Sequence, residues 1–279
     1  MMSEDLTQAY ERDGFAFPVD VVSAFEAQKI RTDLELAESE LATDPEKLTL
    51  LHSHPDRLLP SFDRLIRNTR LIDLVTPILG PDLMVWSSGL FVKEAKSSKI
   101  VTWHQDLNYW YLDNANEITA WVALSPSTIE SGCMRFVPGS HTQQIVPHNE
   151  THTDNNLLAS YTSRGQEIAA EVDYRDGVDV ILQPGQASLH HGHLFHSSGP
   201  NATTDRRIGA SIRYISTSMK QNSGDPTLVA LVSGEDHYGH FTVAGPPRGR
   251  LAEEDFDLCR RDRELKRRVL YLDPTGVKA

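Results

Sequence analysis

The stretch Trp103-His104-Gln105-Asp106-Leu107 places two kinds of metal-binding side chain close together in the sequence. His104 and Asp106 are two residues apart, the separation at which a β-strand directs both side chains to one face. An imidazole and a carboxylate on one face supply two ligands of a metal site. In a chain with 12 histidines and 39 acidic residues, one His-x-Asp pair is weak evidence by itself. Support has to come from a third ligand elsewhere in the chain.

A histidine-rich segment about ninety residues later offers that ligand. Residues 188–201 read Ser-Leu-His-His-Gly-His-Leu-Phe-His-Ser-Ser-Gly-Pro-Asn, with histidines at His190, His191, His193 and His196. Two histidines and one carboxylate, with the opposite positions open, suit a non-heme Fe(II) that also binds a co-substrate and O2. The residue types alone leave the choice among the four histidines open.

An arginine at the start of a predicted strand follows this segment. Arg207 stands eleven residues after His196, and residues 208–215 read Ile-Gly-Ala-Ser-Ile-Arg-Tyr-Ile. A cation fixed on a strand beside the metal suits the distal carboxylate of a dicarboxylic co-substrate, because a guanidinium binds a carboxylate through two parallel hydrogen bonds. A shift of one residue would turn the strand over, so Arg206 is the alternative to Arg207.

Four motifs resemble those of the phytanoyl-CoA dioxygenase family of Fe(II)- and 2-oxoglutarate-dependent oxygenases. They span roughly residues 83–217 in family order and near-family spacing. The motifs are Trp-His-Gln-Asp-Leu at 103–107, Thr-Ala-Trp at 119–121, Gly-Cys-Met-Arg-Phe-Val-Pro-Gly-Ser-His at 132–141, and His-Ser-Ser-Gly-Pro-Asn at 196–201 followed by Arg207. The resemblance implies a mainly β protein with flanking helices. Its core would be a double-stranded β-helix, a jelly roll of the cupin-like kind, with the metal inside.

The resemblance also implies a ligand set. The family pattern has a serine two residues, and an arginine eleven residues, after the second histidine ligand. Only His196 fits both, with Ser198 and Arg207, and His193 is its main competitor. The implied ligands of Fe(II) are then the His104-x-Asp106 pair and His196. Ser198 and Arg207 are implied to hold 2-oxoglutarate.

Four further residues each have two interpretations. Trp121 takes the place of a family tryptophan that lines the co-substrate pocket, with a spacing that differs by about one residue; otherwise it is a core aromatic. Lys93 stands where relatives carry a basic residue that reaches the co-substrate; otherwise it is an edge lysine reaching solvent. His190 and His191 either orient a metal ligand or the co-substrate, or bond to the backbone at a strand end.

The activity implied by the resemblance is hydroxylation. In this enzyme class 2-oxoglutarate chelates Fe(II), O2 binds at an open position, and succinate and CO2 are released. The protein supplies positioning and electrostatics, and the metal and co-substrate carry out the oxidation. Halogenating relatives replace the carboxylate ligand with a small residue so that chloride binds. The presence of Asp106 disfavours that reaction.

The expected substrate is a small zwitterion. Arg213 shares the face of Arg207 by strand alternation, and a second buried cation suits a carboxylate, phosphate or phosphonate. The aromatic residues after the metal motif either attract an ammonium group or pack in the core. The candidate substrate contacts are Asn108, Tyr109, Trp110, Tyr111, Arg213 and Asn201.

The chain is similar in length and in its Leu-His-His-Gly motif at 189–192 to relatives that hydroxylate aminoalkyl- or trimethylaminoalkyl-phosphonates. Such a phosphonate is the preferred substrate hypothesis. The alternatives are a betaine, an ectoine-like molecule, an acyl-CoA or a natural-product intermediate. A metal-binding cupin or sensor that performs no oxidation is the alternative from a different functional class.

The sequence predicts one domain over residues 1–279, because no linker divides it. A helical scaffold over 1–82 should precede a jelly-roll core over 83–217 and an extension over 218–279. Apolar periodicity predicts helices near 3–13, 23–41, 62–79 and 252–272. Short apolar runs between Gly, Pro and Ser clusters predict strands at 15–17, 83–86, 90–93, 100–103, 118–124, 134–137, 178–182, 187–190 and 207–215.

Two polar segments and two histidines remain outside this pattern. The length of residues 142–177 indicates a functional insertion or lid, not a tight turn. Residues 236–241 are either a flap over the barrel mouth or a surface loop. His52 and His54 lie near prolines without other ligand types close by, which indicates structural histidines.

Composition narrows the partners. The net charge of −12 and a pI near 5.4 argue against a nucleic-acid-binding surface, which needs clustered Lys and Arg. The two cysteines indicate a reducing compartment, and neither a signal sequence nor a long apolar run is seen. We therefore expect a cytoplasmic protein that acts on a small molecule without a membrane. The oligomeric state is left open.

Overall fold

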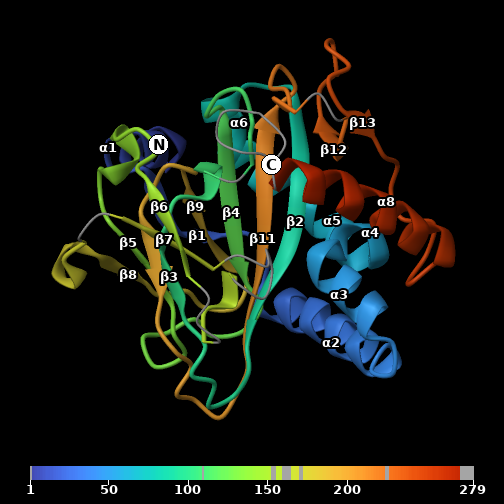
Figure 1. The fold of residues 1–279 in the computed structure, drawn as a ribbon, viewed down its shortest axis with the longest axis horizontal. Coiled ribbons are helices and arrows are strands. Elements are labelled where there is room, and N and C mark those ends of the chain that lie inside the picture. The colour runs from blue at the N-terminus through green and yellow to red at the C-terminus, as the bar shows by residue number, and fades with distance from the viewer. Residues whose placement is uncertain are drawn as a thin grey trace.

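Two β-sheets lie face to face at the centre of the molecule, and helices cover the outer face of the larger one (Figure 1). The structure is a computed structural model that describes residues 2–108, 110–151, 155–158, 165–169, 172–223 and 226–270. A two-sheet β core with flanking helices is the predicted fold class, which is confirmed.

The major sheet has seven strands in the order β1-β9-β4-β11-β2-β12-β13. Their bounds are Phe15–Asp20 (β1), Gln186–His190 (β9), Glu117–Ala123 (β4), Arg207–Ser216 (β11), Leu83–Lys93 (β2), Leu228–Ser233 (β12) and Thr242–Val243 (β13). Neighbouring strands are antiparallel except for β12 and β13. Because β11 lies in the middle, its side chains reach the centre of the sandwich.

The minor sheet has the order β3-β10-β5-β8 and is antiparallel throughout. Its strands are Val101–His104 (β3), His196–Ser198 (β10), Met134–Phe136 (β5) and Val178–Val180 (β8). A separate hairpin pairs β6 (His148–Thr151) with β7 (Gly165–Ile168) and packs beside β3. Short 3-10 turns occur at Asp106–Asn108 (η1), Ser140–Thr142 (η2) and Tyr174–Asp176 (η3).

Strand β11 shows why the major sheet has an apolar face toward the helices and a polar face toward the minor sheet. Ile208, Ala210, Ile212 and Tyr214 face the helices and join the main hydrophobic core. The alternate residues, from Arg207 to Arg213, face the minor sheet, and Arg207 and Ser211 line a cavity there. The period of two along a strand thus separates a helix-facing core from a polar interior.

Helices flank the major sheet. They are Met2–Asp13 (α1), Ala24–Glu40 (α2), Pro45–Ser53 (α3), Pro55–Leu58 (α4), Pro60–Ile66 (α5), Thr69–Leu79 (α6) and Glu253–Leu270 (α8). Helix α2 begins with a capping box in which Ser23 accepts a hydrogen bond from the Glu26 backbone while Glu26 accepts from Ser23. Within the described residues, no helix is both long and apolar enough to cross a membrane.

Several predicted elements differ from the observed ones. The single helix expected at 62–79 is two helices, because the Asn68 side chain caps a new helix after α5 ends. The strands expected at 83–86 and 90–93 are one strand with a bulge near Val85. Strand β1 of the predicted scaffold and β12 of the predicted extension both belong to the major sheet, so the three-part division does not follow the sheet's limits.

Candidate active site

His104, Asp106 and His196 come together between the two sheets. The Asp106 Oδ1 atom lies 3.3 Å from His104 Nε2 and 3.8 Å from His196 Nε2. The three ligand atoms are all within 4.8 Å of one another. Within the described ranges, this is the one group of three such side chains with a spacing that could hold a metal ion.

Strand pairing closes the distance of about ninety residues between the two histidines. His104 ends β3, His196 begins β10, and the two are direct partners in the antiparallel ladder. Asp106 follows the end of β3 and opens the turn η1. The expectation that one strand carries both His104 and Asp106 is therefore wrong. The chain turns after His104, and this turn brings the carboxylate to the imidazoles.

Backbone carbonyls orient both imidazoles. His104 Nδ1 lies 2.9 Å from the Thr102 carbonyl, and His196 Nδ1 lies 3.0 Å from the Leu194 carbonyl. A proton on Nδ1 donated to the carbonyl leaves the Nε2 lone pair of each ring directed at Asp106, as metal-binding histidines require. The contact between Nδ1 and the carbonyl thus fixes the orientation of each ring.

Burial and neighbouring charge set the protonation of the cluster. Burial and the nearby His104 lower the pKa of His196 well below its usual value, which keeps this imidazole neutral. Burial alone would raise the pKa of Asp106, but the adjacent His104 side chain and the charges around the carboxylate hold that pKa below its usual range. A neutral His196 imidazole with an ionised Asp106 carboxylate matches the donor types that suit Fe(II).

Gln105 anchors the metal-binding turn from the outside. Its side chain donates to the His193 carbonyl at 2.9 Å and accepts from the Val146 N–H at 2.9 Å. Its own N–H donates to His148 Nε2 at 3.1 Å. His193 therefore holds the turn through its backbone and is outside the ligand cluster. Neither His148 nor Val146 belongs to a recognisable sequence motif, because both lie in the insertion.

The other end of the cavity is basic. Arg207 and Lys93 are partners on β11 and β2, exposed by 1% and 0%, and Lys93 Nζ lies 2.7 Å from Ser198 Oγ. Lys93 also donates to the Gly199 carbonyl. Burial and the nearby Arg207 lower the pKa of Lys93 to about 6. Lys93 is thus an interior residue and not an edge lysine in solvent.

Trp121 lines the cavity next to Arg207. The guanidinium carbon of Arg207 lies 5.1 Å from the centroid of the Trp121 ring. The ring packs directly over Gly209, where any Cβ would overlap it. Arg206 has the opposite orientation and pairs at the outer surface with Glu38 at 2.8 Å and Glu94 at 3.0 Å. Of the two arginines, Arg207 is the one that faces the cavity.

The predicted substrate contacts lie in different surroundings. Trp110 packs against Trp86 in a hydrophobic cluster, and one face of its ring is covered by the Arg213 guanidinium at 5.2 Å. Asn108 ends η1, the turn that contains Asp106. The Tyr111 carbonyl accepts hydrogen bonds from Asn222 and Gln221. Tyr109 lies outside the described residues.

The prediction for Asn201 needs correction. Its side chain is 1% exposed and donates to the carbonyls of Lys93, Glu94 and Asp205, while its amide oxygen accepts from Thr203. Both ends of the amide are occupied, by carbonyls at the end of β2 and by groups of its own loop. Asn201 therefore supports the loop after β10 and does not offer a group to a substrate.

Part of the insertion borders the cavity. Leu157 and Leu158 pack on Val101 and Phe91, which both line the cavity, and Asn156 donates to the Thr102 hydroxyl at 2.9 Å. These contacts fit an insertion that shapes the site. Residues 152–154, 159–164 and 170–171 of the insertion are outside the described part of the chain.

The loop at 236–241 has local contacts. Asp236 accepts from the N–H groups of Tyr238 and Gly239, both at 3.0 Å, and Phe241 is buried in the cluster with Trp110. The loop is thus anchored at Phe241. The histidines of the helical region also have partners, His52 with Glu38 and His54 with Asp262, as expected of structural histidines.

Glu117 was missed by the sequence analysis. It is 1% exposed, accepts from the Gly192 N–H, and faces the interior next to the metal-binding turn. Burial, and then the charge of Asp106, raise the pKa of Glu117 well above its usual value. A lone Glu at the start of a strand carries no motif that would have revealed it.

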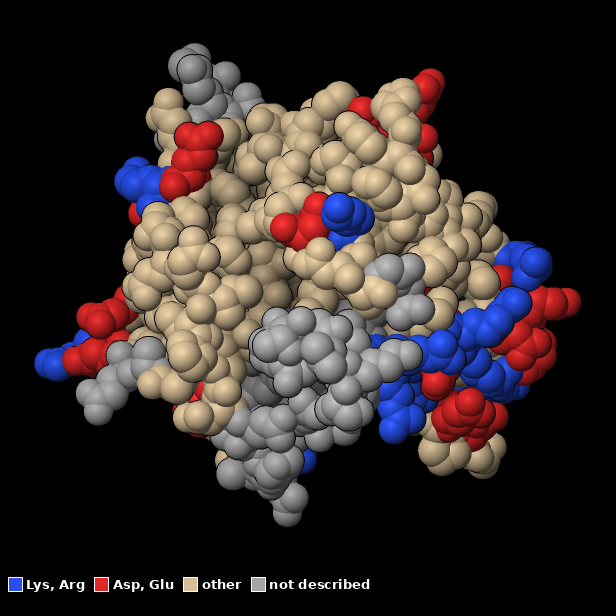
Figure 2. All heavy atoms as spheres, turned by 45° about the horizontal axis from the view of Figure 1, so that its top comes forward, with Lys and Arg blue, Asp and Glu red and all other residues tan. Residues whose placement is uncertain are grey.

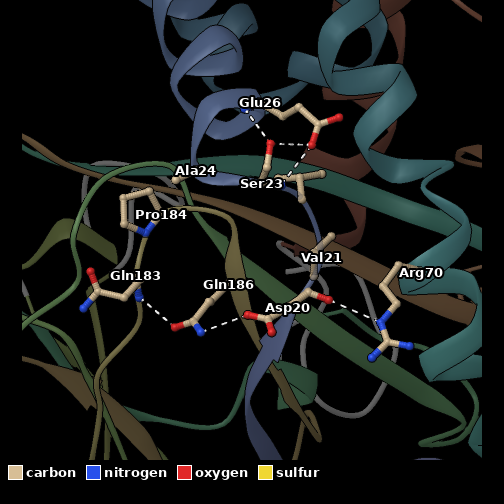
Figure 3. A pocket seen from close by; sticks show the side chains of 10 residues that line it. Asp20, Val21, Ser23, Ala24, Glu26, Arg70, Gln183, Pro184 and Gln186 are labelled. Atoms are coloured by element: carbon tan, nitrogen blue, oxygen red, sulfur yellow. Dashed lines mark hydrogen bonds between the residues drawn. The ribbon is translucent and has the colours of Figure 1, made fainter.

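A second hollow, at the N-terminus of α2, holds no comparable chemistry (Figure 3). Its polar side chains bond to one another or to the backbone: Gln186 donates to Asp20 at 3.0 Å, Arg70 to the Asp20 carbonyl, and Ser23 and Glu26 form the capping box. The cavity between the sheets is therefore the candidate active site.

The comparison with known families decides the classification. The model of the phytanoyl-CoA dioxygenase (PhyH) family matches residues 10–209. The chain belongs to this family. As a phytanoyl-CoA dioxygenase family member it is a 2-oxoglutarate-dependent oxygenase, with Fe(II), 2-oxoglutarate and O2 as its cofactor and co-substrates. The family match covers β1 through the first part of β11 and includes every residue of the metal-binding cluster.

Relatives within the phytanoyl-CoA dioxygenase family have varied names. A Stutzerimonas stutzeri protein named "Probable alpha-ketoglutarate-dependent hypophosphite dioxygenase" is 27% identical over 228 residues, 76% of this chain and 78% of the relative. A Caenorhabditis elegans "Probable phytanoyl-CoA dioxygenase" is 26% identical over 92% of this chain and 75% of its own length. The solved structure of the apo form of the non-heme monooxygenase ThoJ is 30% identical, with a TM-score of 0.85 over 95% of this chain and 97% of that one.

Proposed function

We propose that His104, Asp106 and His196 bind Fe(II) and that Arg207 binds the distal carboxylate of 2-oxoglutarate. The observation that supports this assignment is that His104, Asp106 and His196, whose ligand atoms converge, line the same cavity as the buried Arg207 guanidinium. Ser198 and Lys93 complete this end of the cavity, where a carboxylate bound by Arg207 would favour the charged form of Lys93 and accept a further hydrogen bond from it. Trp121 forms the side of the co-substrate pocket.

The reaction we infer is hydroxylation of a small molecule. When bound, iron and 2-oxoglutarate supply the oxidising chemistry, with consumption of O2 and release of succinate and CO2. The chain holds both partners in place, and its buried cavity excludes bulk water from the reacting centre. Asp106 fills the third ligand position, which favours hydroxylation over transfer of a halide.

For the substrate we propose a zwitterionic aminoalkyl- or trimethylaminoalkyl-phosphonate. Arg213 supports an anionic head because its guanidinium faces the interior and, among the described residues, forms no ion pair within 4.0 Å. The relative named as a hypophosphite dioxygenase is compatible with a phosphorus oxyacid. The alternative is another small metabolite, such as a betaine, an ectoine-like molecule, an acyl-CoA or a natural-product intermediate.

Succinate release across a substrate panel tests this proposal. The purified chain with Fe(II), 2-oxoglutarate and O2 would be given aminoalkylphosphonates, trimethylaminoalkylphosphonates, betaines, ectoine and acyl-CoAs in parallel. We expect the phosphonates to stimulate succinate formation and to gain one oxygen atom by mass spectrometry. Stimulation by another class with none by the phosphonates would replace the substrate proposal while leaving the oxygenase assignment in place.

A further inference from the structure

A row of three polar side chains crosses the major sheet beside the metal-binding cluster. Arg213 on β11 is the direct partner of Thr119 on β4, and Thr119 is the direct partner of His190 on β9. We call Arg213, Thr119 and His190 the polar row. Because neighbouring strands are about 4.8 Å apart, the row spans about 10 Å across the sheet.

The polar row faces the interior. His190 lines the cavity, and its ring centroid lies 5.1 Å from that of His196. Thr119 points to the same side as Trp121, two residues on, and Arg213 to the same side as Ser211; both of these neighbours line the cavity. The row therefore forms one polar wall next to the metal-binding cluster.

Each member of the polar row has a buried polar atom without a protein partner. Thr119 and His190 are exposed by 1% and 2%. In the described part of the chain, Thr119 Oγ1, His190 Nδ1 and Arg213 Nε make no hydrogen bond. Buried polar atoms are nearly always paired in native proteins, because an unpaired one costs folding free energy. Three such atoms in one row indicate a binding surface for a polar group.

The charge of the polar row is not cancelled locally. The Arg213 guanidinium is held by the Ser87 hydroxyl at 3.3 Å and by the Trp110 ring. Glu117 faces the same interior, but its carboxyl accepts from the Gly192 N–H and, among the described residues, forms no ion pair with Arg213. Asp106, the other nearby carboxylate, is directed at the two imidazoles. The buried His190 ring, whose Nδ1 has no protein partner in the described part of the chain, adds a further hydrogen-bonding group.

The polar row is also separate from the basic end of the cavity. Arg207 and Arg213 are six residues apart on one extended strand, which corresponds to about 20 Å along β11. A 2-oxoglutarate carboxylate held by Arg207 therefore leaves Arg213 available to a second anion.

We propose that the polar row binds the oxyanion head of the substrate, a carboxylate or a phosphonate, through the Arg213 guanidinium with Thr119 and His190 as further hydrogen-bonding groups. This inference rests on the proposed function, because it takes the metal-binding cavity as the place of reaction. It assigns Thr119 and His190 to substrate recognition. The group that the polar row binds is then an anion and not an ammonium group.

Binding of simple ions to the loaded protein tests the inference. The full chain would be loaded with Fe(II) and 2-oxoglutarate under anaerobic conditions and titrated in a calorimeter with methylphosphonate, acetate and tetramethylammonium. We expect one or both anions to bind and the cation not to bind. Tighter binding of methylphosphonate assigns a phosphonate head, and tighter binding of acetate assigns a carboxylate head.

Matched threonine variants separate recognition from stability. Thr119→Val removes the hydroxyl while keeping the shape, and should weaken anion binding by about tenfold, the effect of one hydrogen bond to a charged group. Thr227→Val is the control, because Thr227 is equally buried with an unpartnered hydroxyl but lies by β12, outside the cavity. It should bind the anions like the wild type. If T119V does not fold, R213M serves in its place and should abolish anion binding.

Three results would overturn the inference: no anion binding by the loaded wild type, preferential binding of tetramethylammonium, or equal affinities of T119V and T227V. Loading itself is followed by the visible absorption of the Fe(II)–2-oxoglutarate complex. Failure to load refutes the proposed function, whereas loading without anion binding refutes this inference alone.

Discussion

Two adjacent arginines differ completely in their surroundings. Arg206 forms ion pairs with acidic side chains at the outer surface, which bind it to α2 and the β2 end. Arg207 points the other way and is buried against Trp121. The alternation of a strand causes this difference, since one step along β11 changes the face. The two residues therefore provide a matched pair for testing the co-substrate site.

Replacement of Arg207 by methionine should raise the KM for 2-oxoglutarate by about 10- to 100-fold, the usual effect of losing a hydrogen-bonded charge on a carboxylate. Arg206→Met should leave that KM unchanged, because Arg206 is outside the cavity. Succinate formation at varied 2-oxoglutarate concentration measures both. A raised KM in R206M with a normal value in R207M would reverse the assignment.

Single residues also show where sequence reasoning stops. The four motifs led to His104, Asp106, His196, Ser198 and Arg207, and the structure brings all five to one cavity. Glu117 and His148 were missed, and Thr119 was noted only as part of the Thr-Ala-Trp motif without a role, because each gains its position from a distant segment through strand register or loop packing. A lone polar residue in a strand has no local pattern that distinguishes an inward role from a solvated one.

At the scale of elements, the contact between β11 and β4 positions Trp121 beside Arg207, where we propose that 2-oxoglutarate binds. The Trp121 ring covers Gly209, and no side chain larger than hydrogen fits beneath it. The absence of a side chain on one strand thus lets the aromatic ring of the next strand lie flat beside Arg207.

Gly209→Ala should therefore displace Trp121. We expect a loss of about 1–3 kcal/mol in the free energy of unfolding, as for other overpacked interiors, together with a raised KM for 2-oxoglutarate. Gly245→Ala is the control, since a Cβ there meets nothing within 4 Å, and should change stability by less than about 0.5 kcal/mol. Denaturant unfolding and succinate kinetics measure the two effects. Wild-type values for G209A would show that the ring is not fixed by this contact.

Elements with a strong period were predictable, and short ones were not. The helix expected at 23–41 is observed at Ala24–Glu40, and the strand expected at 207–215 is observed as Arg207–Ser216. Strand β10 has three residues, too few to show alternation, although it carries His196. Strand β12 was missed because its place depends on pairing with β2, which leaves no signal in the local sequence.

At the scale of the whole molecule, the helices and the minor sheet pack on opposite faces of the major sheet. Helices cover the apolar face of the major sheet, and the minor sheet packs over its polar face, which lines the cavity (Figure 1). Helix α8 is tied to this body by Asp262, which lies 3.1 Å from His54 Nε2 and accepts from the Leu228 N–H at 2.8 Å. On the face shown in Figure 2, basic and acidic side chains lie side by side and do not form a patch of one sign.

The arrangement of polar groups in the interior depends on strand pairing and cannot be predicted from local sequence. Arg207 and the polar row lie at different points along the face of the major sheet that is turned toward the minor sheet, and His190 of the polar row lies beside His196 of the metal-binding cluster. Under the two proposals above, the co-substrate and the substrate would bind at these separate points. The cytoplasmic location and the single-domain division remain predictions from the sequence.

The central claim is that His104, Asp106 and His196 hold iron beside the 2-oxoglutarate site. Anaerobic titration with Fe(II) in the presence of 2-oxoglutarate tests it most directly, because the complex has a weak charge-transfer band in the visible range. The wild type and the control His193→Ala should develop the band with one Fe(II) per chain, and His196→Ala should not. A band of wild-type strength in H196A, or none in the wild type, would contradict the account.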